Sequence, residues 1–445
     1  MNNSVMKRFL DASSFRSSSR PTASLPFLLY PRRNIVSVSS VEEEDQTANS
    51  SRDREDTGFS SGLNWALAGK GVIVKDKSFR NLNTSELQQK GATVAESLSG
   101  IPVLVRGNAL GGASEISKPQ FSKLLKHVTT HISSVSNIYV HDGAVGSSLK
   151  YGAKVRIISD SPSAILSLSN VLWKAPSRAI SHDSCPLTVY VASSISQGAV
   201  DAVRLGAQAN ESVIAADIDR ASLILCGKAF SDANATKMAL ATLSEPIISA
   251  RGGIPLPARL LVSDDSVILL LAPEDIIQSC AAQLVSTDAG VILSSQDAAP
   301  YFPVKNYSAP SLFKFPVGVV LVTSDSSGTI PSISKLSPGQ AAYHFLAGYQ
   351  NGKFMLAYNR GPSSLDALEL AKAFLSKLKD NQISSFLINV SEGQKSVTGK
   401  VFLRMVESAL SKDIPSFRPK GGDLKAKYNS FLSNKFQEIP EELSF

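Results

Sequence analysis

The sequence has few cysteines and no long apolar run. Its three cysteines, Cys185, Cys226 and Cys280, are an odd number without CxxC spacing, so they predict neither a disulfide framework nor a zinc site. No stretch approaches the roughly 18 consecutive apolar residues of a membrane-spanning helix. We therefore expect no membrane span and a reducing compartment.

Net positive charge is small outside the N-terminal tail. Residues 1–33 hold six Lys and Arg side chains against one acid, Asp11, and so carry a net charge of +5. This leaves +2 of the total of +7 for the remaining residues. The high pI is thus mainly a property of the tail, and nucleic-acid binding is not indicated.

Acidic residues are nearly absent from residues 1–40, which are rich in Ser and Arg. This composition is typical of an organellar transit peptide. Arg32 and Arg33, near the expected cleavage point, favour a mitochondrion over a plastid, and a disordered cytosolic N-terminus is the third alternative. Residues 41–60 are polar and charged and predict a disordered linker, so 1–60 lies outside the folded part.

From residue 61 onward, helical and strand patterns alternate without an internal repeat, which predicts a mixed α/β fold. The Pro-rich span 254–257 suggests a boundary between domains at 61–255 and 256–445. Helices are expected at 83–98, 118–133, 161–171, 201–205, 236–243, 340–348, 365–378, 400–411 and 423–436. Strands are expected at 137–140, 154–159, 187–191, 260–262, 267–271, 291–293, 317–323 and 385–390, whereas 211–216 and 223–225 suit either a strand or a buried helix.

The junction within residues 267–290 lacks glycine and lysine where a nucleotide-binding fold would need them. A phosphate loop uses glycines to converge backbone N–H groups on phosphate and a lysine to contact its outer oxygens. Here a strand runs directly into Pro273, Glu274 and Asp275. Proline in the first turn followed by acids is typical of an ordinary helix start, and the two carboxylates would repel a phosphate.

A long motif in residues 319–349 resembles a region of the ATP-dependent phosphoenolpyruvate carboxykinases. The residues that match in order are Lys335, Leu336, Gln340, Tyr343, His344, Phe345, Gly348 and Tyr349. Weaker similarity extends over roughly residues 80–445. The resemblance implies a two-domain carboxykinase-like α/β fold with mixed sheets and flanking helices, whose C-terminal domain binds a mononucleotide.

The resemblance also implies a reaction, the conversion of oxaloacetate and ATP to phosphoenolpyruvate, CO₂ and ADP with Mg²⁺ or Mn²⁺. The family's phosphate loop would fall on residues 272–280, where Pro273, Glu274, Asp275, Gln278 and Ser279 stand instead. The family's paired metal-binding aspartates would follow strand 291–293, where only Asp297 remains. Lys228 matches a metal-binding lysine, but no histidine accompanies it. We therefore expect no catalytic residues, no metal site and no cofactor.

One substrate-binding residue is carried over. The family's substrate loop would lie near residues 99–112, where Arg106 stands in the place of a carboxylate-binding arginine, although an ordinary loop arginine is the alternative.

Three functions follow from these patterns. The first is a carboxykinase-like pseudoenzyme with a structural or interaction role and protein partners, within an organellar complex. The second is an active carboxykinase, a carboxy-lyase of gluconeogenesis. The third is a sensor of small carboxylates through Arg106.

Overall fold

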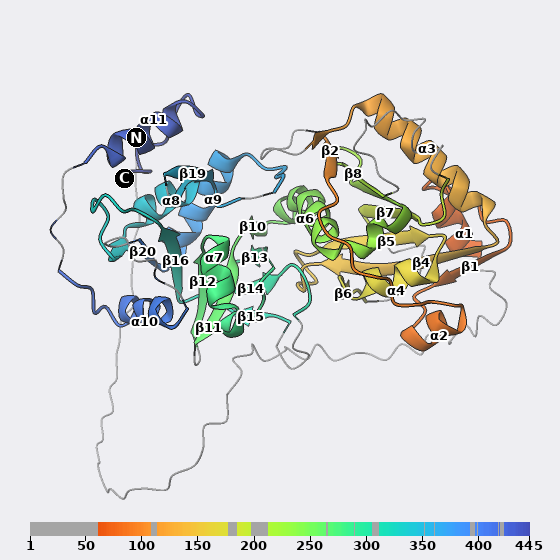
Figure 1. Cartoon of the computed structure of the whole chain (residues 1–445), viewed down its shortest axis with the longest axis horizontal. Coiled ribbons are helices and arrows are strands. Elements are labelled where there is room, and N and C mark those ends of the chain that lie inside the picture. The colour runs from red at the N-terminus through yellow and green to blue at the C-terminus, as the bar shows by residue number, and fades with distance from the viewer. Residues whose placement is uncertain are drawn as a thin grey trace, which may run out of the picture. The chain divides into compact units, whose positions relative to one another are not determined.

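The computed structural model describes residues 61–107, 114–176, 185–196, 212–263, 266–288, 290–304, 311–350, 352–359, 361–391, 397, 399–416, 418 and 422–445. The predicted transit peptide and linker at 1–60 and the expected helix at 201–205 lie outside these residues. The described part is mixed α/β with several mixed sheets and flanking helices, as the sequence predicts (Figure 1).

The first sheet has nine strands among the described residues, in the order β1-β4-β5-β7-β9-β8-β2-β3 with β6 beside β4. Its strands are β1 Lys77–Arg80, β2 Val103–Arg106, β3 Ser114–Glu115, β4 Asn137–Val145, β5 Ala153–Ser159, β6 Trp173–Lys174, β7 Leu187–Ala192, β8 Val213–Asp217 and β9 Ser222–Cys226. Within the ranges 211–216 and 223–225, which suit either a strand or a buried helix, residues 213–216 and 223–225 form strands. The sheet is mixed, because β4 and β5 are antiparallel whereas β5, β7 and β9 are parallel neighbours.

Helices cover both faces of this sheet. They are α1 Ser61–Ala68, α2 Thr84–Gln89, α3 Lys118–Ser134, α4 Pro162–Ser169 and α6 Ala233–Ala250, preceded by the 3₁₀ turn η2 Gly227–Ser231. Successive residues of a strand pack against helices on opposite faces of the sheet. Ile158 packs with α1 and α3, whereas Ile157 packs with α4 and α6. Strand geometry produces this division, since successive side chains point to opposite faces.

The second half of the chain forms smaller sheets. An antiparallel sheet contains β10 Ile254–Leu256, β13 Val291–Leu293, β14 Asp297–Pro300 and β15 Phe313–Lys314. A five-stranded sheet contains β11 Arg259–Ser263, β12 Ser266–Leu271, β16 Gly318–Thr323, β20 Ser384–Asn389 and β17 Ile333–Leu336, in that order. A hairpin pairs β18 Ala347–Gln350 with β19 Lys353–Leu356. The expected strand at 317–323 is confirmed as β16 and is buried on both faces, between the parallel strands β12 and β20.

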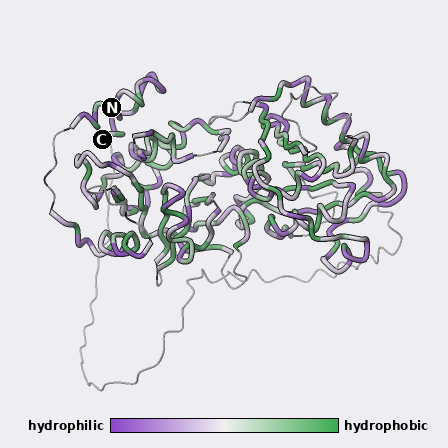
Figure 2. Tube along the Cα trace, viewed as in Figure 1, coloured by the Kyte–Doolittle hydropathy of each residue, from purple (hydrophilic) through white to green (hydrophobic). Residues whose placement is uncertain are grey.

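The helices of this half are α7 Glu274–Ser279, the 3₁₀ turn η3 Ala281–Gln283, α8 Pro338–Leu346, α9 Ala367–Asp380, α10 Gly399–Leu410 and α11 Leu424–Ser433. The helices α8, α9 and α11 pack on one face of the five-stranded sheet, and α7 and α10 pack on the other face. In Figure 2 the strands are mostly hydrophobic and the outer helices are striped with hydrophilic residues. The predicted boundary span 254–257 contains β10, the first strand after α6, and the division into two domains stays a prediction.

Several expected helices have wrong bounds, and the last two residues of the one at 340–348 belong to strand β18. The helix at 83–98 begins as predicted, with a capping box between Asn83 and Glu86, but ends at Gln89 because Gly91 takes a left-handed φ of 90°. The helix at 161–171 ends two residues early. The helix at 236–243 is much longer, because Asp232 caps its start and the chain continues through Pro246.

Candidate functional site

The β12–α7 junction is a strand followed by a short helix, as predicted. Pro273 is the N-cap residue, with an extended backbone and no side-chain capping bond. The sequence predicts this proline at the first helical position, so it lies one position earlier relative to the helix than expected. Glu274 accepts a hydrogen bond from Gln278 (2.6 Å), and its other oxygen lies 3.6 Å from the Arg259 guanidinium. Asp275 accepts from the Gln350 amide at 3.3 Å. Both acids of this helix start thus contact polar side chains of their own chain.

Ser279, the last predicted position of this junction, contacts a different element. Its hydroxyl accepts a hydrogen bond from the Gly399 N–H at the start of α10 (3.0 Å) and donates to the Ile276 carbonyl (2.8 Å). Ser279 therefore links α7 to α10 by a hydrogen bond.

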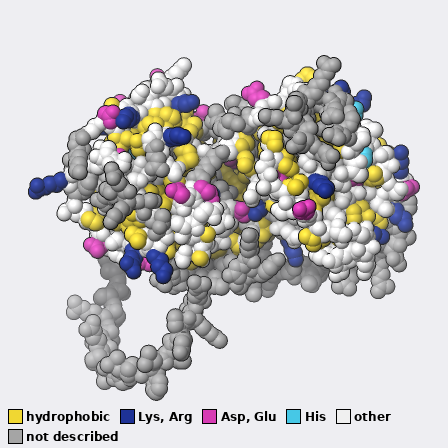
Figure 3. Space-filling view, in the orientation of Figure 1, with side chains coloured by type: hydrophobic (Ala, Val, Ile, Leu, Met, Phe, Trp, Pro, Cys, Tyr) yellow, Lys and Arg dark blue, Asp and Glu magenta, His cyan; other side chains and the backbone are white. Residues whose placement is uncertain are grey.

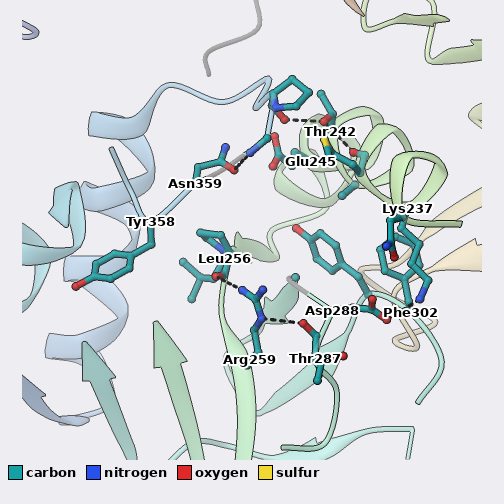
Figure 4. A pocket seen from close by; sticks show the side chains of 18 of the residues that line it. Lys237, Thr242, Glu245, Leu256, Arg259, Thr287, Asp288, Phe302, Tyr358 and Asn359 are labelled. Atoms are coloured by element: carbon teal, nitrogen blue, oxygen red, sulfur yellow. Dashed lines mark hydrogen bonds and ion pairs between the residues drawn. The ribbon is translucent and has the colours of Figure 1, made fainter. Parts of the chain in front are cut away.

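A cavity of about 480 Å³ lies beside this junction. It is walled by α6, the β10–β11 segment, the start of α7, the turn before β13, the segment after β14 and the segment after β19 (Figure 4). Its charged lining residues are Lys237, Glu245, Arg259, Glu274 and Asp288. Tyr301 and Tyr358 contribute aromatic rings, and the hydroxyl of Tyr358 donates to the Val322 carbonyl at 2.8 Å.

Both cations of this cavity are paired with acids. The Lys237 ammonium lies 2.7 Å from the Asp288 carboxylate and 5.6 Å from the centre of the Phe302 ring. Arg259 donates from Nε to the Thr287 carbonyl (3.2 Å) and faces Glu274. An anion entering the cavity would have to compete with Asp288 and Glu274 for these two groups.

Glu245 has a different environment. One carboxylate oxygen, Oε2, accepts from the Ser363 hydroxyl (2.9 Å), the Ser364 N–H (2.9 Å) and the Ser364 hydroxyl (3.1 Å). Burial raises the pKa of Glu245 to about 7, and the hydrogen bonds from Ser364 and Ser363 oppose this only in part. Figure 4 shows Glu245 toward Thr242 and Asn359, with Arg259, Thr287 and Asp288 across the cavity.

Sequence reasoning missed most of this cavity. Of the predicted positions at the phosphate-loop junction, Glu274 and Gln278 line it. Lys237 lies in the stretch 224–243 that the resemblance marks for a lysine, yet the sequence favours Lys228, which belongs to η2. Glu245 has a local signal, an acid before proline within an apolar helical run, but its serine partners are more than 100 residues away.

Arg106 lies at the end of β2, paired with two acids. Its guanidinium contacts Asp217 at 2.5 Å and Asp219 at 2.9 Å, and 15% of its side chain is exposed. A carboxylate ligand would have to displace one of these partners. Binding of a carboxylate by Arg106 stays a prediction.

The motif at 319–349 builds structure around a buried turn. Asp325, which follows β16, accepts from the N–H groups of Ser327 (2.9 Å), Thr329 (3.1 Å) and Ile330 (2.9 Å). Tyr343 and His344 of α8 lie in an aromatic cluster with Tyr428 and Phe445.

Burial lowers the pKa of His344 to about 4, so this imidazole is neutral near pH 7. Near the cavity, Asp297 accepts from the Ser294 hydroxyl at 2.7 Å and closes the tight β13–β14 turn.

Comparison with known proteins identifies this second half. Residues 288–404 match the family model described as phosphoenolpyruvate carboxykinase. A phosphoenolpyruvate carboxykinase (ATP) of Geobacillus kaustophilus is 28% identical over 130 residues, which are 26% of this chain and 25% of the relative. The enzyme of the same name from Bacillus mycoides is 29% identical over 148 residues, 28% of each protein.

Residues 288–404 are thus similar in sequence to part of the ATP-dependent phosphoenolpyruvate carboxykinases. The match spans only about a quarter of the length of these curated relatives. It includes Asp288, Tyr301 and Tyr358 of the cavity, whereas α6 and the β12–α7 junction precede it.

Neither a metal-binding cluster nor a membrane-spanning helix is present among the described residues. Within the described ranges, no three His, Cys, Asp or Glu side chains are grouped so that they could hold a metal ion. No helix among those same residues is long and apolar enough to cross a bilayer.

Proposed function

We propose that this carboxykinase relative is a pseudoenzyme that has lost nucleotide-dependent catalysis and acts through its surfaces. The observation that carries the proposal is the pairing of both cations of the cavity with acids, beside a helix start that has two carboxylates and no glycine or lysine. Triphosphate binding needs free cations and converging backbone N–H groups.

The residues present do not fit ATP with Mg²⁺ or Mn²⁺. At about 5 Å and an effective dielectric of about 20, each carboxylate near a phosphate charge costs roughly 3 kcal/mol. That is about two orders of magnitude in affinity for each acid. We therefore propose that the protein uses no cofactor and carries out no catalytic step.

The decisive experiment is calorimetric titration of the purified chain with Mg-ATP. We expect no saturable binding up to about 1 mM, while the Geobacillus kaustophilus relative, titrated under the same conditions, serves as the positive control. Sub-millimolar binding by this chain would overturn the proposal and favour the active carboxykinase, with ATP and Mg²⁺ or Mn²⁺.

We further propose that the protein works in the mitochondrion as a subunit of a larger assembly. The support is the Ser- and Arg-rich composition of residues 1–40. On the face shown in Figure 3, Lys and Arg side chains are scattered among acids. Purification of the tagged protein from isolated mitochondria should yield stoichiometric partners, whereas a lone monomer, or its recovery from plastids or cytosol, would contradict this.

A further inference from the structure

The cavity beside α7 contains one charge without an opposite partner among the described residues. Lys237 pairs with Asp288, and Arg259 with Glu274. The carboxylate of Glu245 receives hydrogen bonds only from neutral groups, all of them on Oε2. Lys237 is eight residues from Glu245 in the same helix, a separation of about 12 Å along its axis.

A second cavity confirms this isolation. Glu245 also lines a space of about 200 Å³, whose other described lining residues all have neutral side chains. They are Pro255, Pro257, Phe354, Met355, Leu356, Ala357, Asn359, Ser363, Leu365, Ala367 and Leu370. A buried carboxylate without a counter-ion is costly when ionised, and a cation that reaches it removes that cost.

Part of the remaining wall of the larger cavity is apolar. Leu256, Pro257, Met238 and the rings of Tyr301 and Tyr358 line the same space. Its volume of about 480 Å³ is in the range of small-molecule sites, which combine an apolar lining with a few polar groups.

We propose that this cavity binds a small primary amine, whose ammonium group pairs with the free oxygen of Glu245 while its apolar body contacts the lining side chains. The site thus selects for a cation. The ion pairs Lys237–Asp288 and Arg259–Glu274 each have no net charge and form part of the lining. This inference does not depend on the loss of catalysis, because amine binding and ATP binding are measured separately.

The test is titration of the full chain at pH 8 with three amines, each against a neutral counterpart of the same shape. The pairs are butylamine and butanol, benzylamine and benzyl alcohol, and tyramine and 4-ethylphenol. We expect at least one amine to saturate the protein and to bind at least about tenfold more tightly than its neutral counterpart. Failure of all three amines to bind at 10 mM, or equal binding of the neutral molecules, would overturn the proposal.

Two glutamine variants assign the binding to Glu245. Glu245→Gln keeps the shape and the acceptor for Ser363 and Ser364 but removes the charge, and we expect amine affinity to fall at least about tenfold. Glu369→Gln makes the same change on exposed α9, where 69% of the side chain is accessible, and should leave affinity unchanged. A folded Glu245→Gln protein that binds amines as tightly as the unaltered chain would refute the assignment.

The pH dependence gives an independent readout. With a pKa of about 7, ionisation of Glu245 rises about tenfold between pH 6 and pH 8, and amine affinity should rise with it. The titratable and charged groups that face this site are Lys237, Arg259, Glu274, Asp288, Tyr301 and Tyr358. Because these groups are unchanged in Glu245→Gln, a flat profile in that variant assigns the rise to Glu245, and an identical rise in both would contradict it.

Discussion

Two neighbouring parallel strands, β12 and β16, end at the same edge of one sheet in turns of opposite character. After β16, Asp325 is 2% exposed as a whole residue, and its carboxylate accepts three backbone N–H groups. After β12, the side chain of Glu274 is 43% exposed and contacts Arg259 and Gln278, which line the cavity. The turn after β16 lies within the span shared with the carboxykinases, and the turn after β12 precedes it.

The difference is in what the acid of each turn does. Asp325 organises its own loop, and Asn389 of β20 stabilises that loop by accepting from the Asp325 N–H (2.9 Å) and donating to the Ile330 carbonyl (3.0 Å). The acids after β12 accept hydrogen bonds from the side chains of Gln278 and Gln350. We therefore expect the turn after β12 to tolerate changes that the turn after β16 does not.

The largest effect is expected when the turn after β16 is broken. Asp325→Ala leaves three backbone donors without their acceptor and should lower the free energy of unfolding by about 3–5 kcal/mol. Urea denaturation at pH 7 measures this. Asp325→Asn keeps one acceptor oxygen and is the matched control, with a loss of about 1–2 kcal/mol. If Asp325→Ala costs less than 1 kcal/mol, this turn is not structural and the comparison fails.

The second effect concerns Glu245, the carboxylate whose environment is opposite to that of Asp325. Burial opposes ionisation of Asp325, but hydrogen bonds from Ser327, Ile330 and Thr329 outweigh it and lower its pKa. For Glu245, burial prevails and the pKa rises from 4.5 to about 7. Between these two values the unfolded chain loses its proton before the folded chain does, so stability falls as pH rises.

Glu245→Gln should therefore stabilise the protein at pH 8, by up to about 3 kcal/mol, and should have little effect at pH 4. Thermal unfolding across this pH range measures the difference between the two proteins. Equal pH profiles for Glu245→Gln and the unaltered chain would show that the carboxyl ionises normally. His344, whose pKa is lowered to about 4, acts in the other direction and removes stability as pH falls from 6.5 to 4.

Local signals in the sequence predicted most of the fold. The capping box of Asn83 and Glu86 marks the start of α2, and the uninterrupted apolar run of β16 marks a strand buried on both faces. The β11–β12 hairpin follows from two apolar runs with a polar break between them. Such features depend on residues within one or two turns of each other.

The cavity could not be predicted in this way, because its chemistry depends on distant pairs. Lys237 meets Asp288 across 51 residues, and Glu245 meets Ser364 across 119. Arg106 shows the same limit, since its partner Asp217 lies on a neighbouring strand 111 residues away. A single sequence indicates that these residues are charged, but not which charges neutralise one another.

The smallest effect is expected at the turn after β12. Glu274→Ala removes a surface contact with Arg259 and one favourable charge at the start of α7, and should lower the free energy of unfolding by less than about 1 kcal/mol. Asp275→Ala is the matched variant outside the cavity lining and should behave alike. Because Glu274 also neutralises Arg259, its removal should strengthen binding of phosphate to the cavity, whereas Asp275→Ala should change it less. A loss of stability at Glu274 as large as that at Asp325 would mean that both turns are structural, and that the acids after β12 are there to hold the fold.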